Sequence, residues 1–150
     1  MQTRRRRQGA IAIFAALGAF LIAFPGCGDL SRSELDRGVE SLSALAAQGE
    51  LIANGVARDA TKSTYTRVMA KTLGGEAEHE AEKLADAEPS PEVGDERDAA
   101  VRVAAELADL FSELQTFPGD EHHGELIEEQ MGEVKSRSDA IVERLTGEEP

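Results

Sequence analysis

The first chemistry that this sequence suggests is metal binding by histidine and carboxylate. Glu76 and His79 have the spacing Glu-x-x-His, by which one helix can present two metal ligands from adjacent turns. A two-metal centre needs a second such pair, and the closest match is Asp120 with His123. If both pairs lie on parallel helices of a bundle, His79 and His123 are offset by about 20 Å, whereas paired metal ions lie about 4 Å apart. We therefore predict no metal cofactor.

The other reactive side chains form no recognisable catalytic motif. His122 and His123 are adjacent, so on a helix their side chains point about 100° apart, and we interpret them as surface residues. The sequence has neither a nucleophile elbow nor a phosphate-binding glycine loop. The acidic run from Glu76 to Glu88 lacks the glycine-turned spacing of a calcium loop. We predict that the protein is not an enzyme and has no cofactor.

Cys27 is the only cysteine, and it follows a segment typical of an export signal. Four consecutive arginines, Arg4 to Arg7, precede an apolar run of sixteen residues from Gly9 to Phe24. A membrane-spanning helix needs about 20 apolar residues, so this run is short for a permanent span. Its length and flanks instead favour a signal peptide.

The four residues Phe24-Pro25-Gly26-Cys27 resemble the lipobox of bacterial lipoproteins. Gly26 and Cys27 match the pattern, whereas Phe24 replaces the usual leucine and Pro25 the usual alanine or serine. The resemblance implies that Cys27 is diacylated, becomes the mature N-terminus and anchors the protein in the bacterial membrane, facing outside the cytoplasm. A secreted protein and an uncleaved anchor are the alternatives, but neither explains the cysteine. We expect a signal peptide at 1–26, a lipidated tether at 27–30 and a helical domain at 31–147.

The expected mature chain is strongly acidic. All 29 acidic residues follow Cys27 but only 12 of the 16 basic ones do, which gives residues 27–150 a formal charge of −17. Nucleic-acid binding depends on clustered Lys and Arg, so a nucleic-acid partner is not expected. The expected partners are a membrane, through the lipid on Cys27, and an unknown envelope protein. Self-association is a further alternative.

The chain after the signal predicts four amphipathic helices. The first begins at Ser31-Arg32-Ser33-Glu34, a capping-box pattern. A turn over Asp59 to Thr64 precedes the second helix, in which Gly74 and Gly75 indicate either close packing or a kink. The proline-rich linker from Glu88 to Gly94 precedes a third helix capped by Asp95 and ended by Pro118-Gly119. The fourth runs from about Glu121 to Thr146, with Gly147 as its stop.

Each helix has apolar residues at alternating steps of three and four, which predicts a buried stripe. In the first helix the stripe is Leu35, Val39, Leu42, Ala46, Gly49, Ile52 and Val56, and in the second it is Tyr65, Met69, Leu73, Ala77, Ala81 and Leu84, with Val68 beside them. In the third helix the stripe is Ala100, Val103, Ala104, Leu107, Leu110, Phe111, Leu114 and Phe117. In the fourth it is Ile127, Met131, Val134, Ser138, Ile141 and Leu145.

Four helices of similar length with short connections predict an all-α protein, an up-down-up-down four-helix bundle. The alternative is a long helical hairpin, continuous over residues 32–86, that self-associates. For function, we expect a non-enzymatic interaction or scaffolding module of the cell envelope. The alternative is a carrier that binds a ligand or metal ion in a polar pocket inside the bundle, with Glu76 and His79 as its first candidates.

Overall fold

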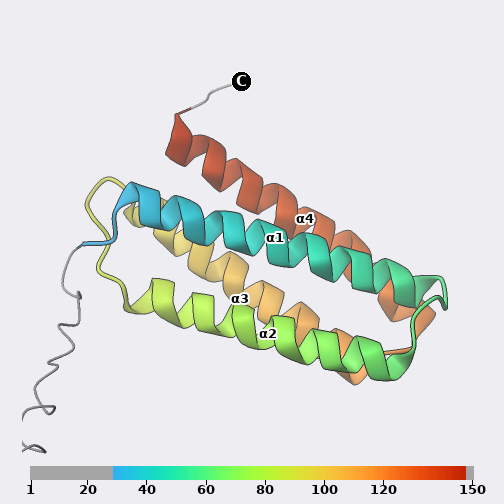
Figure 1. The fold of residues 1–150 in the computed structure, drawn as a ribbon. Coiled ribbons are helices and arrows are strands. Elements are labelled where there is room, and N and C mark those ends of the chain that lie inside the picture. The colour runs from blue at the N-terminus through green and yellow to red at the C-terminus, as the bar shows by residue number, and fades with distance from the viewer. Residues whose placement is uncertain (1–28, 148–150) are drawn as a thin grey trace, which may run out of the picture.

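The computed structural model describes residues 29–147, and four helices make up most of this part of the chain. They are α1 (Arg32–Ala57), α2 (Ser63–Asp86), α3 (Gly94–Thr116) and α4 (Glu121–Thr146). Successive helices run in opposite directions (Figure 1). The protein is therefore the predicted four-helix bundle. The alternative long hairpin is wrong, because α1 ends at Ala57 instead of continuing into α2.

The four helices pack as two close pairs. α1 lies along α4 and α2 lies along α3, and the contacts within each pair are far more extensive than those between the pairs. α1 also touches α3 across the middle of the bundle, whereas α2 and α4 are not in contact. The pairs meet along two less extensive junctions, one between α3 and α4 and one between α1 and α2, and the second of these faces the viewer in Figure 1.

The helix ends mostly follow the predicted signals. Ser31 and Glu34 form the complete capping box at the start of α1, and Gly147 ends α4 in the left-handed conformation that glycine favours. The predicted cap of α3 is wrong. The buried Val93 is at the N-cap position, two residues earlier than predicted, so α3 begins at Gly94 and Asp95 lies in its first turn. A carboxylate there interacts favourably with the positive end of the helix dipole.

The predicted buried stripes of α1 and α4 are confirmed at every position, and that of α3 at every position except Phe117. Phe117 is 41% exposed because it follows the last turn of α3, where its ring stacks on His123. Phe111 is the largest fully buried side chain, at the centre of the core. Every core residue lies between Leu30 and Leu145, so a chain that begins at Asp29 contains the whole described core.

The first turns of α2 differ from the prediction. Tyr65 and Val68 are 53% and 59% exposed, whereas Thr66 is fully buried. The Thr66 hydroxyl lies 3.3 Å from the Thr61 hydroxyl, so the buried oxygen has a hydrogen-bond partner. The inner face of these turns is made of small side chains such as Thr66 and Ala70, which allow α2 to pack closely.

Glycine allows the closest approach within each helix pair. A Cβ atom on Gly74 of α2 would lie 3.2 Å from Cβ of Phe111 on α3. On Gly124 of α4 it would lie 2.6 Å from the backbone nitrogen of Ala57, at the end of α1. Of the two explanations for Gly74, close packing is the correct one, because α2 is a single continuous helix.

Polar side chains connect α1 to α4 along the edge of their interface. Asp139 accepts hydrogen bonds from the Ser43 hydroxyl at 2.7 Å and from the Lys135 ammonium at 2.8 Å. The Lys135 ammonium, and secondarily the Ser43 hydroxyl, lower the pKa of the Asp139 carboxyl. Farther along, the Asn54 amide donates to Glu128 at 2.7 Å. These bonds fix the register of α1 against α4.

The segment before α1 is fastened to the linker between α2 and α3. The backbone N–H of Leu30 donates to the Glu88 carbonyl at 2.7 Å, and the N–H of Ser90 donates to the Leu30 carbonyl at 3.4 Å. Leu30 is also part of the hydrophobic core. The bundle therefore begins at Leu30, which is the last residue of the segment predicted to be a lipidated tether, 27–30.

Candidate functional site

The predicted lipidation site, Cys27, lies outside the described residues. The nearest described residues are the exposed Asp29 and the buried Leu30. Leu30 lies three residues after Cys27, and an extended chain spans at most about 3.6 Å per residue. The stretch from Cys27 to Leu30 can therefore span at most about 11 Å of backbone.

Glu76 and His79, the predicted candidates of the carrier hypothesis, are both exposed on α2. They do not meet Asp120 and His123, because α2 and α4 are the diagonal helices that make no contact. Among residues 29–147 there is no group of three or more His, Cys, Asp and Glu side chains placed to bind one metal ion. Glu76 and His79 therefore do not form a pocket inside the bundle.

The core offers few polar groups that could bind a ligand. The buried side chains of residues 29–147 are apolar apart from Thr66 and Ser138. The Ser138 hydroxyl donates to the Val134 carbonyl, one turn earlier in α4, at 3.1 Å. Both polar groups thus have hydrogen-bond partners within the protein.

Of the two histidines near the start of α4, His123 contacts residues of the turn between α3 and α4. Asp120 caps α4 by accepting from the backbone N–H of His123 at 2.9 Å. That N–H, with a smaller contribution from the His123 imidazole, lowers the pKa of the Asp120 carboxyl. The imidazole also stacks on Phe117, with ring centroids 4.1 Å apart. His123 therefore fastens the α3–α4 turn, and His122 is exposed beside it.

A surface groove of about 450 Å³ lies between the start of α1 and the end of α2. Its apolar lining is Leu30, Gly38, Leu84 and Ala87, and its polar lining is Glu34, Arg37, Ser41, Glu80 and Lys83. Gly38 leaves room for the Glu80 carboxylate, since a Cβ atom at this position would lie 2.9 Å from it and would displace that side chain.

The polar rim of the groove carries both signs of charge. Glu80 is paired with Lys83 at 3.0 Å, and its side chain is only 13% exposed. The Ser31 hydroxyl, followed by the Ser31 backbone N–H, lowers the pKa of the Glu34 carboxyl. An apolar floor with paired charges around it suits an aromatic group that has a polar tip, such as the side chain of tyrosine.

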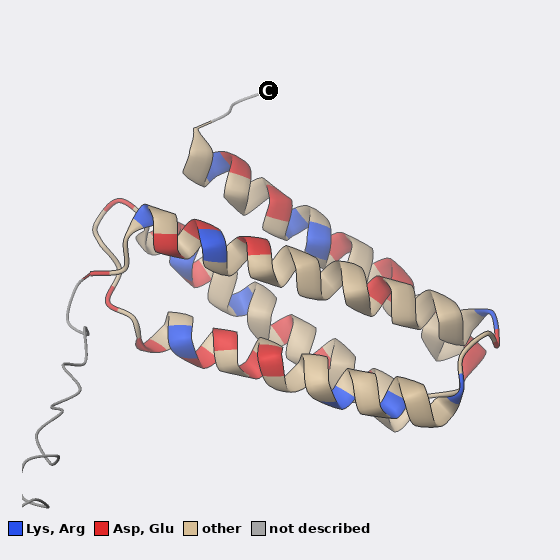
Figure 2. Cartoon of the chain, viewed as in Figure 1, with Lys and Arg blue, Asp and Glu red and all other residues tan. Residues whose placement is uncertain are grey.

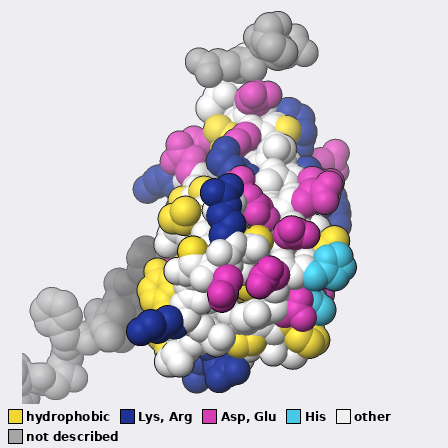
Figure 3. Space-filling model, turned by 90° about the vertical axis from the view of Figure 1, so that its right-hand side faces the viewer, with side chains coloured by type: hydrophobic (Ala, Val, Ile, Leu, Met, Phe, Trp, Pro, Cys, Tyr) yellow, Lys and Arg dark blue, Asp and Glu magenta, His cyan; other side chains and the backbone are white. Residues whose placement is uncertain are grey.

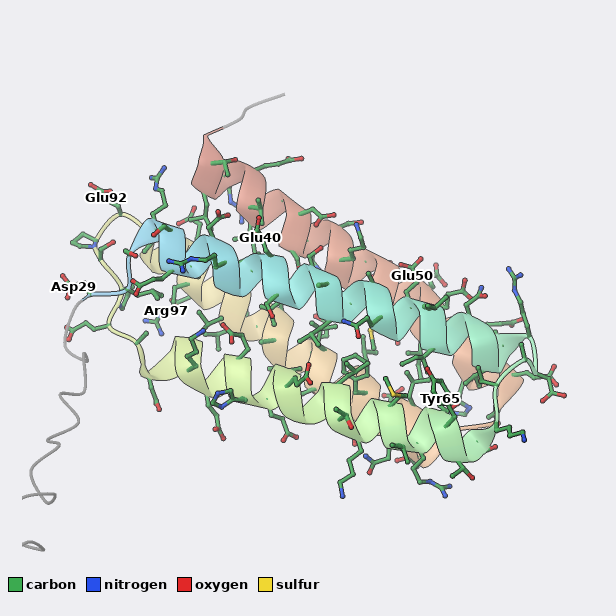
Figure 4. The ribbon with its side chains drawn as sticks, in the orientation of Figure 1. Asp29, Glu40, Glu50, Tyr65, Glu92 and Arg97 are labelled. Atoms are coloured by element: carbon green, nitrogen blue, oxygen red, sulfur yellow. The ribbon has the colours of Figure 1, made fainter. Side chains whose placement is uncertain are left out.

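Large hydrophobic side chains reach the surface at the opposite end of the molecule. Five are exposed among residues 29–147, namely Leu51, Tyr65, Val68, Phe117 and Leu126. All belong to the half of the bundle that holds the α1–α2 and α3–α4 turns, far from Asp29 (Figure 4). Figure 3 views the molecule from that end, where hydrophobic side chains lie among charged ones and histidine lies at one edge.

No protein-family model, curated protein or solved structure matches this chain. In residues 29–147 none of the helices is both long and apolar enough to cross a membrane.

The groove and the exposed hydrophobic residues were not predicted from the sequence. The groove is lined by residues distant in the chain, such as Gly38 and Glu80, which are 42 residues apart. The exposure of Tyr65 and Val68 could have been inferred from Thr66, Ala70 and Gly74, whose small side chains mark the tightly packed face of α2.

Proposed function

We propose that this chain is a non-enzymatic lipoprotein of the bacterial cell envelope, anchored by lipid on Cys27 and facing outside the cytoplasm. The observation that carries the proposal is the position of the only cysteine, directly after a basic and apolar leader in a lipobox-like sequence. In the proposed mature protein, the four-helix bundle is an acidic interaction module at the membrane surface.

The position of Leu30 supports a short connection between lipid and bundle. Leu30 is fixed to the α2–α3 linker, so few residues remain between Cys27 and the folded domain. A single acyl chain binds a membrane only marginally, but two or more give a stable anchor at about 0.8 kcal/mol per buried methylene. The anchored end of the bundle would stay beside the bilayer, with the α1–α2 and α3–α4 turns projecting away from it.

The surface of the bundle supports binding as its role. The groove beside α1 and the exposed hydrophobic residues at the far end are features of contact surfaces between proteins. By contrast, the two buried polar side chains, Thr66 and Ser138, are occupied by hydrogen bonds within the bundle. We therefore prefer an interaction module to a carrier with an internal pocket.

Metabolic labelling tests the anchor. Bacteria that express the full chain are grown with an alkyne-bearing fatty acid, and the purified protein is examined for label. We expect label on the wild-type protein, with recovery in the membrane fraction. Cys27→Ala and the conservative Cys27→Ser should both lose the label. A wild-type protein without label, or a Cys27→Ala protein that retains it, rules out the proposal.

A further inference from the structure

The two halves of α2 carry opposite charge on the side that faces away from the bundle. The exposed residues of this side recur at steps of three and four, and we call them the α2 face: Arg67, Lys71, Gly75, Glu78, Glu82 and Asp86. Counted over these residues alone, the first half of the face is basic and the second half is acidic. Figure 2 shows the same division, with blue segments in the first half of α2 and mostly red segments in its second.

The outward side of α4 carries the reverse order of charges. Its exposed residues recur at steps of three, four and seven, and we call them the α4 face: Leu126, Glu129, Glu133, Arg137 and Arg144. The first half of this face is acidic, and residues 120–134 contain no Lys or Arg. The second half is basic, and its Arg137 and Arg144 also pair with Glu106 and Glu96 of α3.

The two faces lie on opposite sides of the bundle. α1 touches α3 across the middle, whereas α2 and α4 are not in contact, so α2 and α4 form two opposite corners. Both helices run in the same direction (Figure 1). They also begin at the same end, because a Cβ atom on Gly119, just before α4, would lie 2.6 Å from the Ser63 hydroxyl oxygen. Residues equally far from the helix starts, Ser63 and Glu121, therefore lie at about the same height on the bundle.

Opposite charges lie at equal heights on the two faces. Three pairs match in this way: Lys71 with Glu129, Glu78 with Arg137, and Asp86 with Arg144. Counted from the helix starts, the first pair stands eight residues along both helices, the second 15 and 16, and the third 23 along both. Glu78 lies one turn from Gly74, which contacts Phe111 of α3, so it is on the α3 side of α2, as Arg137 is on the α3 side of α4.

Neighbouring exposed residues fit the same alignment. Val68 and Leu126, which are 59% and 46% exposed, each stand five residues after the start of their helix. Glu143 follows Asp139, which bonds to α1, by one turn, so it lies on the α1 side of α4. Lys83 lines the groove on the α1 side of α2 and stands at nearly the same height, 20 residues along against 22.

We propose that copies of this chain associate side by side in the same direction, with the α2 face of one copy against the α4 face of the next. A sideways shift without rotation brings the two faces together at equal height and forms all three charge pairs. Because the faces lie on opposite corners, two copies share only one such contact, and each keeps a free face. Association therefore continues as an open row.

The charges select this direction over the opposite one. Turning one copy end over end would place Lys71 beside Arg137 and Glu78 beside Glu129, and such like-charge contacts disfavour an orientation. Exposed ion pairs are individually weak, so the association is weak in solution and stronger where an anchor holds the copies at high local concentration. The inference rests on the proposed function only here, because lipid on Cys27 would align the copies in one bilayer.

The test uses the chain from Asp29 to Pro150, which contains the whole described core but not Cys27, so its outcome does not depend on the anchor. At about 0.1 M salt, repulsion beyond about 10 Å is screened while charges in contact still attract. We expect sedimentation equilibrium to show a mass that rises with concentration beyond that of a dimer. In about 1 M salt the protein should return toward the monomer.

Charge reversal identifies the two faces. Arg67→Glu with Lys71→Glu, and separately Glu129→Lys with Glu133→Lys, should each raise the dissociation constant about tenfold or more. An equimolar mixture of the two variants should associate again, because each reversed face meets a complementary one. Arg58→Glu with Lys62→Glu changes the net charge as the first variant does but lies outside both faces, so it should have a much smaller effect. Circular dichroism verifies that all variants are folded.

Several outcomes overturn the proposal. They are a monomer at millimolar concentration, a mixture that associates no better than its separate variants, and an equal loss in the Arg58 and Lys62 control. A chain that stays monomeric but binds vesicles of anionic lipid through Arg67 and Lys71 would assign the basic half of the α2 face to a lipid surface instead.

The direction is tested with cysteines, since residues 29–150 contain none. Thr64 and His122 are exposed and each stand one residue after the start of their helix. We expect Thr64→Cys protein mixed with His122→Cys protein to form a mixed disulfide under mild oxidation. Ser136, on the outward side of α4, stands 14 residues farther along. If Ser136→Cys protein cross-links to Thr64→Cys protein equally fast, the same-direction arrangement is wrong.

Discussion

Gly124 and Gly132 lie on the same helix in different surroundings. A Cβ atom on Gly124 would lie 2.6 Å from the backbone of Ala57, whereas one on Gly132 would have nothing within 4 Å. Backbone cannot move aside as a flexible side chain can. We expect Gly124→Ala to lower the free energy of unfolding by about 1–3 kcal/mol, because α1 and α4 are forced apart. Gly132→Ala should raise it by about 0.5–1 kcal/mol, since alanine favours the helix. Urea denaturation measures both, and equal effects would contradict the packing described for Gly124.

Asp139 makes the stability depend on pH. Lys135 and Ser43 lower the pKa of the Asp139 carboxyl because they stabilise its ionised form in the folded protein. This contribution to the free energy of unfolding is present above the ordinary carboxyl pKa of 3.8, and it is lost as pH falls through the lower pKa of the folded protein. We expect Asp139→Asn to cost about 0.5–1 kcal/mol at neutral pH, a modest value because the side chain is half exposed. The difference should disappear near about pH 2. Urea denaturation at both pH values tests this, and a difference independent of pH would contradict it.

At the scale of single helices, most of the fold could be predicted because the signals are local. The capping box at Ser31, the linker prolines and Gly147 act within a few residues of themselves. The inner stripe of α2 could not be placed by hydrophobicity alone. Tyr65 is more hydrophobic than Thr66, yet Thr66 is buried, because α2 is positioned by close contact with its neighbours rather than by its own most apolar side.

The capping box at the start of α1 shares one residue, Glu34, with the groove. Glu34 lines the groove and accepts hydrogen bonds from the Ser31 hydroxyl at 2.6 Å and the Ser31 backbone N–H at 3.0 Å. We expect Ser31→Ala to cost about 1 kcal/mol and to accelerate amide hydrogen exchange in the first turn of α1. Ser33→Ala, in the same turn, removes only the 3.4 Å contact between the two serine hydroxyls and keeps both bonds of the capping box, so it should have a much smaller effect. Exchange rates that do not differ between the two variants would argue against this role.

At the scale of the molecule, the sequence predicted the bundle but not its surface. The number and direction of the helices follow from four periodic stripes and three short connections. Which helices pair closely is decided by Gly74 against Phe111 and Gly124 against Ala57, contacts between residues distant in the chain. The same pairing leaves the α1/α2 junction open enough for the groove. Glu76 and His79 were candidates because of their local spacing, but both are exposed on the surface of α2. The groove, by contrast, joins residues that no local motif links.

Phe111 connects the two helix pairs. It packs against Gly74 of α2, and its ring lies 3.1 Å from the position of a Cβ atom on Gly49 of α1, where Met131 of α4 also converges. We expect Phe111→Ala to lower the free energy of unfolding by about 3–5 kcal/mol, because the cavity loosens both pairs at once. Phe117→Ala, at the exposed phenylalanine, should cost much less. Since one core joins the pairs, thermal unfolding followed by circular dichroism should remain a single transition in both variants. Two separate transitions in the Phe111→Ala protein would show that α1 with α4 and α2 with α3 unfold independently.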